Sequence, residues 1–221
     1  MTQEAAAPEK RGMSRRTKAV IGLGAVVAIA AGVTAAAFTD FANLNLGANG
    51  IGADQYNIQV VDTDPVTGAQ IPGSWQEADT PAGAPIEIVG ANTIFPGSAP
   101  ISVDIPVRNA SATLNSTLSL GLVQLPDSGA DVTDPNYLSS LRFDVSMPAT
   151  SLGATPISVT DQTYAQLSSL TLNGLAAGEV SDVTISVRLL TQAESGASFT
   201  DNSLNGMKAF IQAQFNGTST P

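Results

Sequence analysis

The stretch ISVDIPVR, residues 101–108, alternates apolar and polar side chains without a break. Successive side chains of a β-strand point to opposite faces of a sheet, so this alternation predicts a strand with one buried and one solvated face. Ile105 lies on the face expected to be buried, and Asp104 lies on the face expected to be exposed. Pro106 lacks the backbone N–H that a ladder uses, which predicts a sheet edge or a missing donor that points outward.

The same period of two recurs along most of the chain. Further alternating runs are residues 118–122, 141–147, 183–187 and 209–215, and shorter strand candidates are residues 56–61, 86–89 and 157–159. Turn signals separate these runs, namely Asp64-Pro65, Pro72-Gly73, Pro96-Gly97, Pro126 to Gly129 and Ala177-Gly178. Many short alternating strands without long helical patterns predict an all-β protein, an antiparallel β-sandwich.

Helix is a minor component of this prediction. The candidates are residues 135–141, where Asp134 is expected to cap the first turn, and residues 162–170. Residues 63–83 are rich in Pro, Gly, Asp and Thr, so they are expected to form an extended loop around Trp75.

Residues 1–36 have the layout of a secretory signal peptide. An uncharged stretch and the small residues 34–37 follow a positive n-region, which consists of Arg11, Arg15, Arg16 and Lys18. Cleavage is expected after Ala36, and the bond after Ala37 is the second choice, because small residues precede both bonds. The alternative is a permanent transmembrane anchor, since the uncharged run 19–39 is long enough to cross a bilayer. That run consists mostly of Ala, Gly and Val, so its insertion would be only weakly favourable.

Cleavage would place a short apolar segment at a free N-terminus. Chain ends are usually disordered unless something ties them down, and this segment is too apolar for a free tail, with Phe38, Phe41, Leu44 and Leu46. Residues 37–52 are therefore predicted to be a donor strand with a flexible tether, which adds to the sheet of a neighbouring subunit. Residues 53–221 would form the sandwich domain. The competing interpretation is that the same strand pairs within its own subunit.

The charge of the chain excludes some classes of partner. Residues after Ala36 carry 4 basic and 17 acidic side chains, a net charge of −13. Such a surface repels nucleic acid and anionic lipid, so no nucleic-acid partner is expected, and membrane contact is expected only transiently, through the signal peptide. The chain has no Cys, so burial rather than a disulfide framework must hold the core.

The residue types argue against catalysis. The chain contains neither His nor Cys, which removes the common nucleophile–base pairs and the most frequent metal ligands. Asp127-Ser128-Gly129 matches the triplet of aspartic proteases, but that mechanism needs a second such triplet, and the chain has none. A Pro-Asp-Ser-Gly string is typical of a tight turn. We therefore expect no enzyme activity, no catalytic residues and no cofactor.

Two acidic clusters are candidate calcium sites. One contains Asp62 and Asp64, and the other contains Asp127, Asp131 and Asp134. Neither completes a known calcium loop, because the twelfth position of the first is Gly73 rather than the bidentate Glu. Solvated acidic loops are the expectation, and a weak extracellular calcium site is the alternative.

Several motifs resemble the TasA and camelysin family of bacterial proteins, which are exported with a dedicated signal peptidase of the SipW type. The junction Thr34-Ala35-Ala36 followed by Ala37-Phe38-Thr39-Asp40 is similar to that of the family. Further similar segments are Phe95 to Ser98, the strand 101–107 with Arg108 to Ser111, Leu175 to Glu179, and Asn202, Gly206 and Ile211 to Phe215 near the end. The resemblance implies a jelly-roll-like β-sandwich that forms fibres in the extracellular matrix of biofilms, with the N-terminal segment of one subunit completing a sheet in the next. Some relatives carry a metalloprotease label, which does not transfer to a chain without His.

Two classes of function follow from the sequence. The first is a secreted structural subunit, whose partners are further copies of itself in a head-to-tail homopolymer and the signal peptidase during export. The second is a monomeric adhesion or ligand-binding module at the cell surface, which would use the acidic loops and the loop around Trp75.

Overall fold

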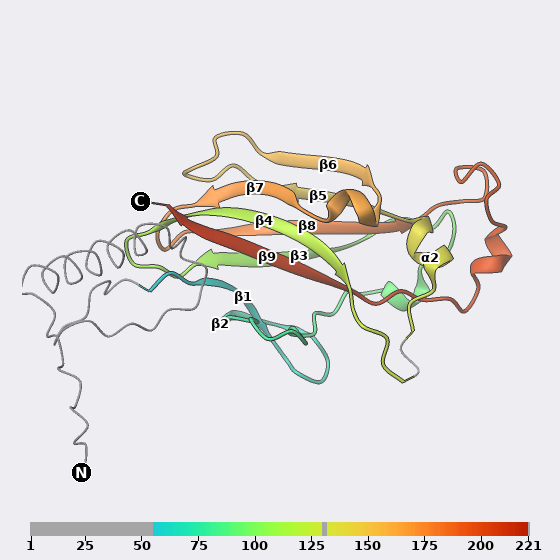
Figure 1. Cartoon of the computed structure of the whole chain (residues 1–221), viewed down its shortest axis with the longest axis horizontal. Helices are drawn as coiled ribbons and strands as arrows, with labels where there is room; N and C mark the ends of the chain where they lie inside the picture. Colours follow the sequence, from blue (N-terminus) through green and yellow to red (C-terminus); the bar gives the residue numbers. More distant parts are fainter. Residues whose placement is uncertain (1–54, 130–131, 221) are drawn as a thin grey trace, which may run out of the picture. The chain divides into compact units, whose positions relative to one another are not determined.

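Two antiparallel sheets make up the part of the chain that the computed structural model describes, residues 55–129 and 132–220 (Figure 1). The strands are β1 (Ile58–Thr63), β2 (Gln70–Gln76), β3 (Ile101–Asn109), β4 (Asn115–Gln124), β5 (Leu141–Met147), β6 (Ile157–Gln162), β7 (Leu170–Leu175), β8 (Val180–Leu189) and β9 (Ile211–Thr220). One sheet has the order β2-β1-β3-β8-β5-β6, and the other has the order β7-β4-β9. The chain passes repeatedly from one sheet to the other, so the predicted all-β sandwich is confirmed.

The core lies between the inner faces of the two sheets. Ile105 on β3 and Ile185 on β8 are 4% and 6% exposed, which confirms the faces expected from their alternation. Leu120 from the middle of β4 is completely buried against them from the opposite sheet. Asp104 stands on the outer face of β3 and is exposed. Burial therefore follows the period of two that the sequence shows.

The expectation of an extended loop at residues 63–83 is wrong, because β2 lies within it. The carboxylate of Asp64 accepts hydrogen bonds from the backbone N–H groups of Val66 and Thr67, and Gly68 adopts φ 74°. These contacts form a tight connection that turns β2 back onto β1. The pair Pro72-Gly73 is not the connection but a bulge, since Val61 opposes Trp75 while the next residue, Asp62, already opposes Ile71.

Pro106 does not lie on an edge strand, because β3 pairs with β1 on one side and with β8 on the other. The backbone of Asn109 is bonded on the β8 side, through Glu179 and Gly178, so by alternation the nitrogen of Pro106 faces β1. The β1–β3 register ends at Val60 opposite Val107, one residue before Pro106 would need to donate. The expectation of an edge strand is therefore wrong, and the missing donor of Pro106 faces β1 at a position where the β1–β3 ladder has already ended.

The helix α2 (Pro135–Ser140) forms where it was expected. Asp134 caps it by accepting from the backbone N–H groups of Asn136 at 2.8 Å and Tyr137 at 3.0 Å. Residues 162–170 form no α-helix: β6 ends at Gln162, a 3-10 turn η2 spans Tyr164–Leu167, and β7 starts at Leu170. Residues 86–89 form no strand either. Two further 3-10 turns are η1 (Ala91–Thr93) and η3 (Asp201–Leu204).

The sheets differ in width, so segments outside the strands close the sides of the sandwich. On one side η2 inserts Leu167, which is 1% exposed, into the core. On the other side Ile86, Ile88 and Ile94 pack against the core from the connection between β2 and β3, but each is only partly buried. The second side is therefore the less completely covered one.

Candidate assembly site

The edge of the smaller sheet is formed by β9, which pairs with β4 along its whole length (Figure 1). The backbone N–H of Leu125 donates to the carbonyl of Phe210 at 3.0 Å, and these two residues lie next to Gln124 and Ile211, the last opposed pair of the β4–β9 ladder. Because hydrogen-bonded pairs alternate in an antiparallel ladder, the backbone groups of Ile211, Ala213 and Phe215 point away from β4. Within residues 55–129 and 132–220, no strand pairs with that edge.

The same three residues also present apolar side chains that are only half covered. Phe215 lies opposite Leu120 and Ala213 lies opposite Leu122, so their side chains face the core. They pack against the buried cluster but remain partly exposed. An edge with free backbone groups and half-covered apolar side chains offers both of the interactions that strand addition uses.

An apolar cleft of about 190 Å³ opens beside this edge. Its walls come from both sheets and from the connection between β2 and β3, and they include Ile86, Ile88, Val103, Ile105, Leu122, Phe143, Ile211 and Ala213. Tyr137 contributes the only hydroxyl group among the lining side chains, and burial raises the pKa of that hydroxyl above its usual value of 10.0. The cleft can therefore accept apolar groups but no charged group.

Both ends of β9 are partly covered by other segments. At the first end the side-chain amide of Gln212 lies 3.5 Å from the carbonyl oxygen of Pro81. At the other end a Cβ atom on Gly217 would lie 2.1 Å from the hydroxyl oxygen of Tyr56 and 2.6 Å from Cγ1 of Ile58. The accessible part of the edge is thus the stretch between these contacts, around Ala213 and Phe215.

The predicted cleavage and donor residues lie outside the described part of the chain. They are Ala36, Ala37, Phe38, Phe41, Leu44 and Leu46. The helices that the structure does describe are all too short or too polar to cross a bilayer. The structure thus supplies the candidate acceptor, while the candidate donor remains a prediction from sequence.

The carboxylates of the first acidic cluster, Asp62 and Asp64, accept hydrogen bonds from nearby groups. Asp62 accepts from the N–H of Thr63 and from the hydroxyl of Ser74, both at 2.9 Å. Backbone N–H groups of Thr67 and Val66 hold the pKa of Asp64 below its usual value. The two carboxylates therefore organise the β1–β2 connection.

Two carboxylates of the second cluster also accept hydrogen bonds from backbone N–H groups. Asp127 accepts from the N–H of Thr133 at 3.0 Å, and Asp134 caps α2. Asp131 lies outside the described residues. No group of three or more potential metal-ligating side chains occurs in the part of the chain that the structure describes.

Trp75 lies against an arginine rather than in an open loop. The guanidinium carbon of Arg108 is 4.7 Å from the centre of the Trp75 ring, and the guanidinium donates to the side-chain carbonyl of Gln59. Since the cation covers one face of the ring, only the other face of Trp75 could stack on a ligand. The loop expected to bind a ligand is therefore part of the wide sheet.

Sequence reasoning missed β7 and the openness of the β9 edge. The alternation of Leu170 and Leu172 is the signal for β7, but Gly174 interrupts the run after it. The backbone carbonyl of Ser116 explains why position 174 is a glycine, because a Cβ atom there would lie 2.5 Å from the carbonyl oxygen.

Comparison of the chain with known protein families and with curated proteins finds no match.

Proposed function

We propose that this protein is a secreted structural subunit that assembles head to tail into extracellular matrix fibres, through addition of residues 37–46 of one copy to the β9 edge of the next. The observation that carries the proposal is the free β9 edge beside an apolar cleft. A heterologous contact of this kind repeats without closing, which gives a filament. This is also the assembly that the resemblance to the TasA and camelysin family implies.

The donor segment matches the acceptor edge in polarity, and it is longer than the accessible stretch of β9. That stretch lies around Ala213 and Phe215, whereas the proposed donor strand comprises residues 37–46. In an extended segment Phe38, Leu44 and Leu46 share one face, which would turn toward the apolar cleft. Phe41 would lie on the opposite face with the outward side chains of β9.

A truncation tests the proposal. The protein beginning at residue 37 is compared with the protein beginning at residue 47, by electron microscopy for filaments and by light scattering for mass. We expect filaments from the longer protein and folded monomers from the shorter one, because only the longer protein carries the donor strand. Filaments from the shorter protein would contradict strand donation. A shorter protein that fails to fold would favour pairing of the segment within its own subunit.

A second variant tests the acceptor edge in the intact chain. Ala213→Pro removes a backbone N–H that faces the free edge, and it leaves the ladder between β9 and β4 intact because Ala213 does not donate to β4. We expect a folded protein that forms no filaments. Gln214→Ala, an exposed neighbour on the outer face, is the matched control and should still assemble. Equal assembly of both variants would exclude this edge as the acceptor.

The competing function is a monomeric binding module at the cell surface. It would be supported if the protein beginning at residue 37 remained monomeric at every concentration tested. The same light-scattering series therefore distinguishes the two functions.

A further inference from the structure

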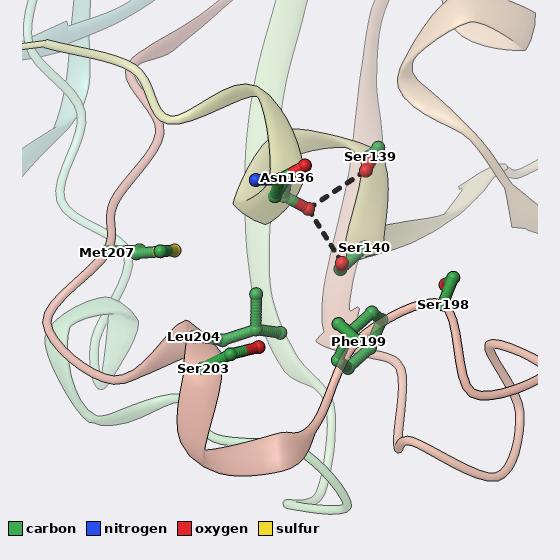
Figure 2. Close-up of a pocket in the computed structure, with 8 residues that line it drawn as sticks. All are labelled: Asn136, Ser139, Ser140, Ser198, Phe199, Ser203, Leu204 and Met207. Carbon is green, nitrogen blue, oxygen red and sulfur yellow. Dashed lines mark hydrogen bonds between the residues drawn. The ribbon is translucent and has the colours of Figure 1, made fainter.

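A second cavity lies at the end of the sandwich, between α2 and the chain around η3 (Figure 2). It encloses about 240 Å³, and none of its lining residues lies on β9. Figure 2 shows Asn136, Ser139 and Ser140 of α2 on one side and Phe199 and Leu204 on the facing segment. The cavity is thus separate from the assembly edge and is built by a different part of the chain.

The lining is polar but carries no charge. Four of its eight side chains are serines, and the others are Asn136, Phe199, Leu204 and Met207. An anion or a cation bound here would have no counter-charge, and burial of an unpaired charge is unfavourable. The composition therefore selects a neutral ligand.

Three of the four serine hydroxyl groups of the lining are arranged as acceptors. Ser139 and Ser140 both donate to the backbone carbonyl of Asn136, at 2.9 and 2.7 Å, and Ser203 donates to the carbonyl of Thr200 at 2.7 Å. Each hydroxyl has a single proton, so these three oxygens can only accept a hydrogen bond from a ligand. A suitable ligand must therefore carry several O–H or N–H donors.

An apolar surface completes the cavity. The ring of Phe199 faces α2 beneath Ser140, and Leu204, which is 4% exposed, closes the cavity beside it (Figure 2). A pyranose ring combines an apolar C–H face with several hydroxyl donors and carries no charge. We propose that this cavity binds a neutral pyranose unit of a saccharide, with its hydroxyls on the serine oxygens and its C–H face on Phe199.

The direct test uses methyl glucoside as the probe and saturation-transfer NMR as the measurement, which works on the full chain in monomeric or assembled form. We expect saturation transfer with a dissociation constant of about 1–10 mM, as for other small polar ligands. Glucosamine and glucuronate, which carry a charge, should give weaker signals. No transfer to methyl glucoside, or transfer to glucosamine alone, would overturn the proposal.

A serine variant locates the binding. Ser139→Ala combined with Ser203→Ala removes two acceptor oxygens from exposed positions, so the fold should persist and binding should weaken by about tenfold or more. Ser195→Ala is the matched control, because Ser195 donates to the carbonyl of Gln192 at 2.8 Å in the same region but does not line the cavity. Unchanged binding in the double variant would overturn the assignment, as would equal loss in the control.

Discussion

Single polar residues hold one end of the sandwich together. Asn109 is completely buried, donates from its side chain to the carbonyl groups of Leu114 at 2.8 Å and Leu175 at 3.1 Å, and accepts from the N–H of Ser111. Its backbone N–H donates to the carbonyl of Glu179. Because every polar group of this side chain has a partner, its burial is compatible with a stable core.

The carboxylate of Glu179 makes stability at this end depend on pH. Partial burial acts against ionisation of Glu179, but hydrogen bonds from the N–H groups of Ser151 and Ala176 outweigh it and hold the pKa below its usual value of 4.5. A depressed pKa in the folded state contributes stability that is complete above pH 4.5 and is lost as the pH falls below it.

Glu179→Gln removes this titration. We expect the unmodified protein to lose more stability than the variant between about pH 7 and about pH 3.5, and the effect to be small because the group is largely solvated. Urea unfolding of both proteins at the two pH values measures the difference. A parallel loss of stability in both proteins would show that Glu179 does not contribute.

The inner and outer faces of β3 can be tested by substitution of single residues. Ile105→Asp places an unpaired carboxylate in the core, and we expect a loss of several kcal/mol of unfolding free energy, enough to unfold a domain of ordinary stability. Asp104→Ser on the outer face is the control and should shift the melting temperature by only a few degrees. Calorimetry of both variants is the measurement, and comparable damage from both would contradict the register of β3.

At the scale of the element, the close approach of β1 to β9 requires a glycine at position 217. Gly217 on β9 lies under Tyr56 and Ile58, and a Cβ atom there would be 2.1 Å from the Tyr56 hydroxyl. This contact brings the start of β1 against the end of β9, although the strands belong to different sheets. The glycine is therefore required by packing rather than by its backbone conformation.

Gly217→Val tests this contact. We expect destabilisation by about 1–3 kcal/mol, the usual effect of overpacking, because the new side chain must displace Tyr56 or Ile58. Thr218→Val, the same new side chain at the exposed neighbouring position, should be nearly neutral. Chemical denaturation compares the two, and equal stabilities would mean that β1 and β9 are not in contact in solution.

At the scale of the whole molecule, six strands face three, and this inequality leaves one side of the sandwich with a free edge and a cleft. The opposite side is closed by η2, which fills it with Leu167. The proposed donor strand would extend the smaller sheet and cover the half-buried residues of β9. Under that proposal the molecule is complete only when a strand occupies this edge.

The predicted export and cleavage of the full chain can also be tested. Expression of the full chain in a host with a SipW-type peptidase should release a protein whose N-terminal sequence begins at Ala37, or at Phe38 if the second bond is cut, because small residues precede both bonds. N-terminal sequencing of the secreted material is the measurement. An intact Met1 in protein recovered from the membrane would instead support the transmembrane anchor.

Local patterns in the sequence suffice to predict the all-β class and the buried faces of the strands. In ISVDIPVR the choice of face follows from local alternation, and the cap of α2 follows from Asp134 and the residues next to it, so neighbours along the chain suffice to predict both. The sequence around Trp75 predicts a loop because Pro72-Gly73 is also a turn signal. Only the partner strand β1 shows that this pair is a bulge.

The tertiary structure alone decided which strands became neighbours and which edge stayed free. The pairs β3–β8 and β4–β9 join residues that lie far apart in the chain, and no local pattern encodes their order in the sheets. The cleft and the serine-lined cavity depend on that order, because each is lined by segments distant in sequence. Local patterning fixes what a residue buries, whereas the packing of whole elements fixes where a surface remains open.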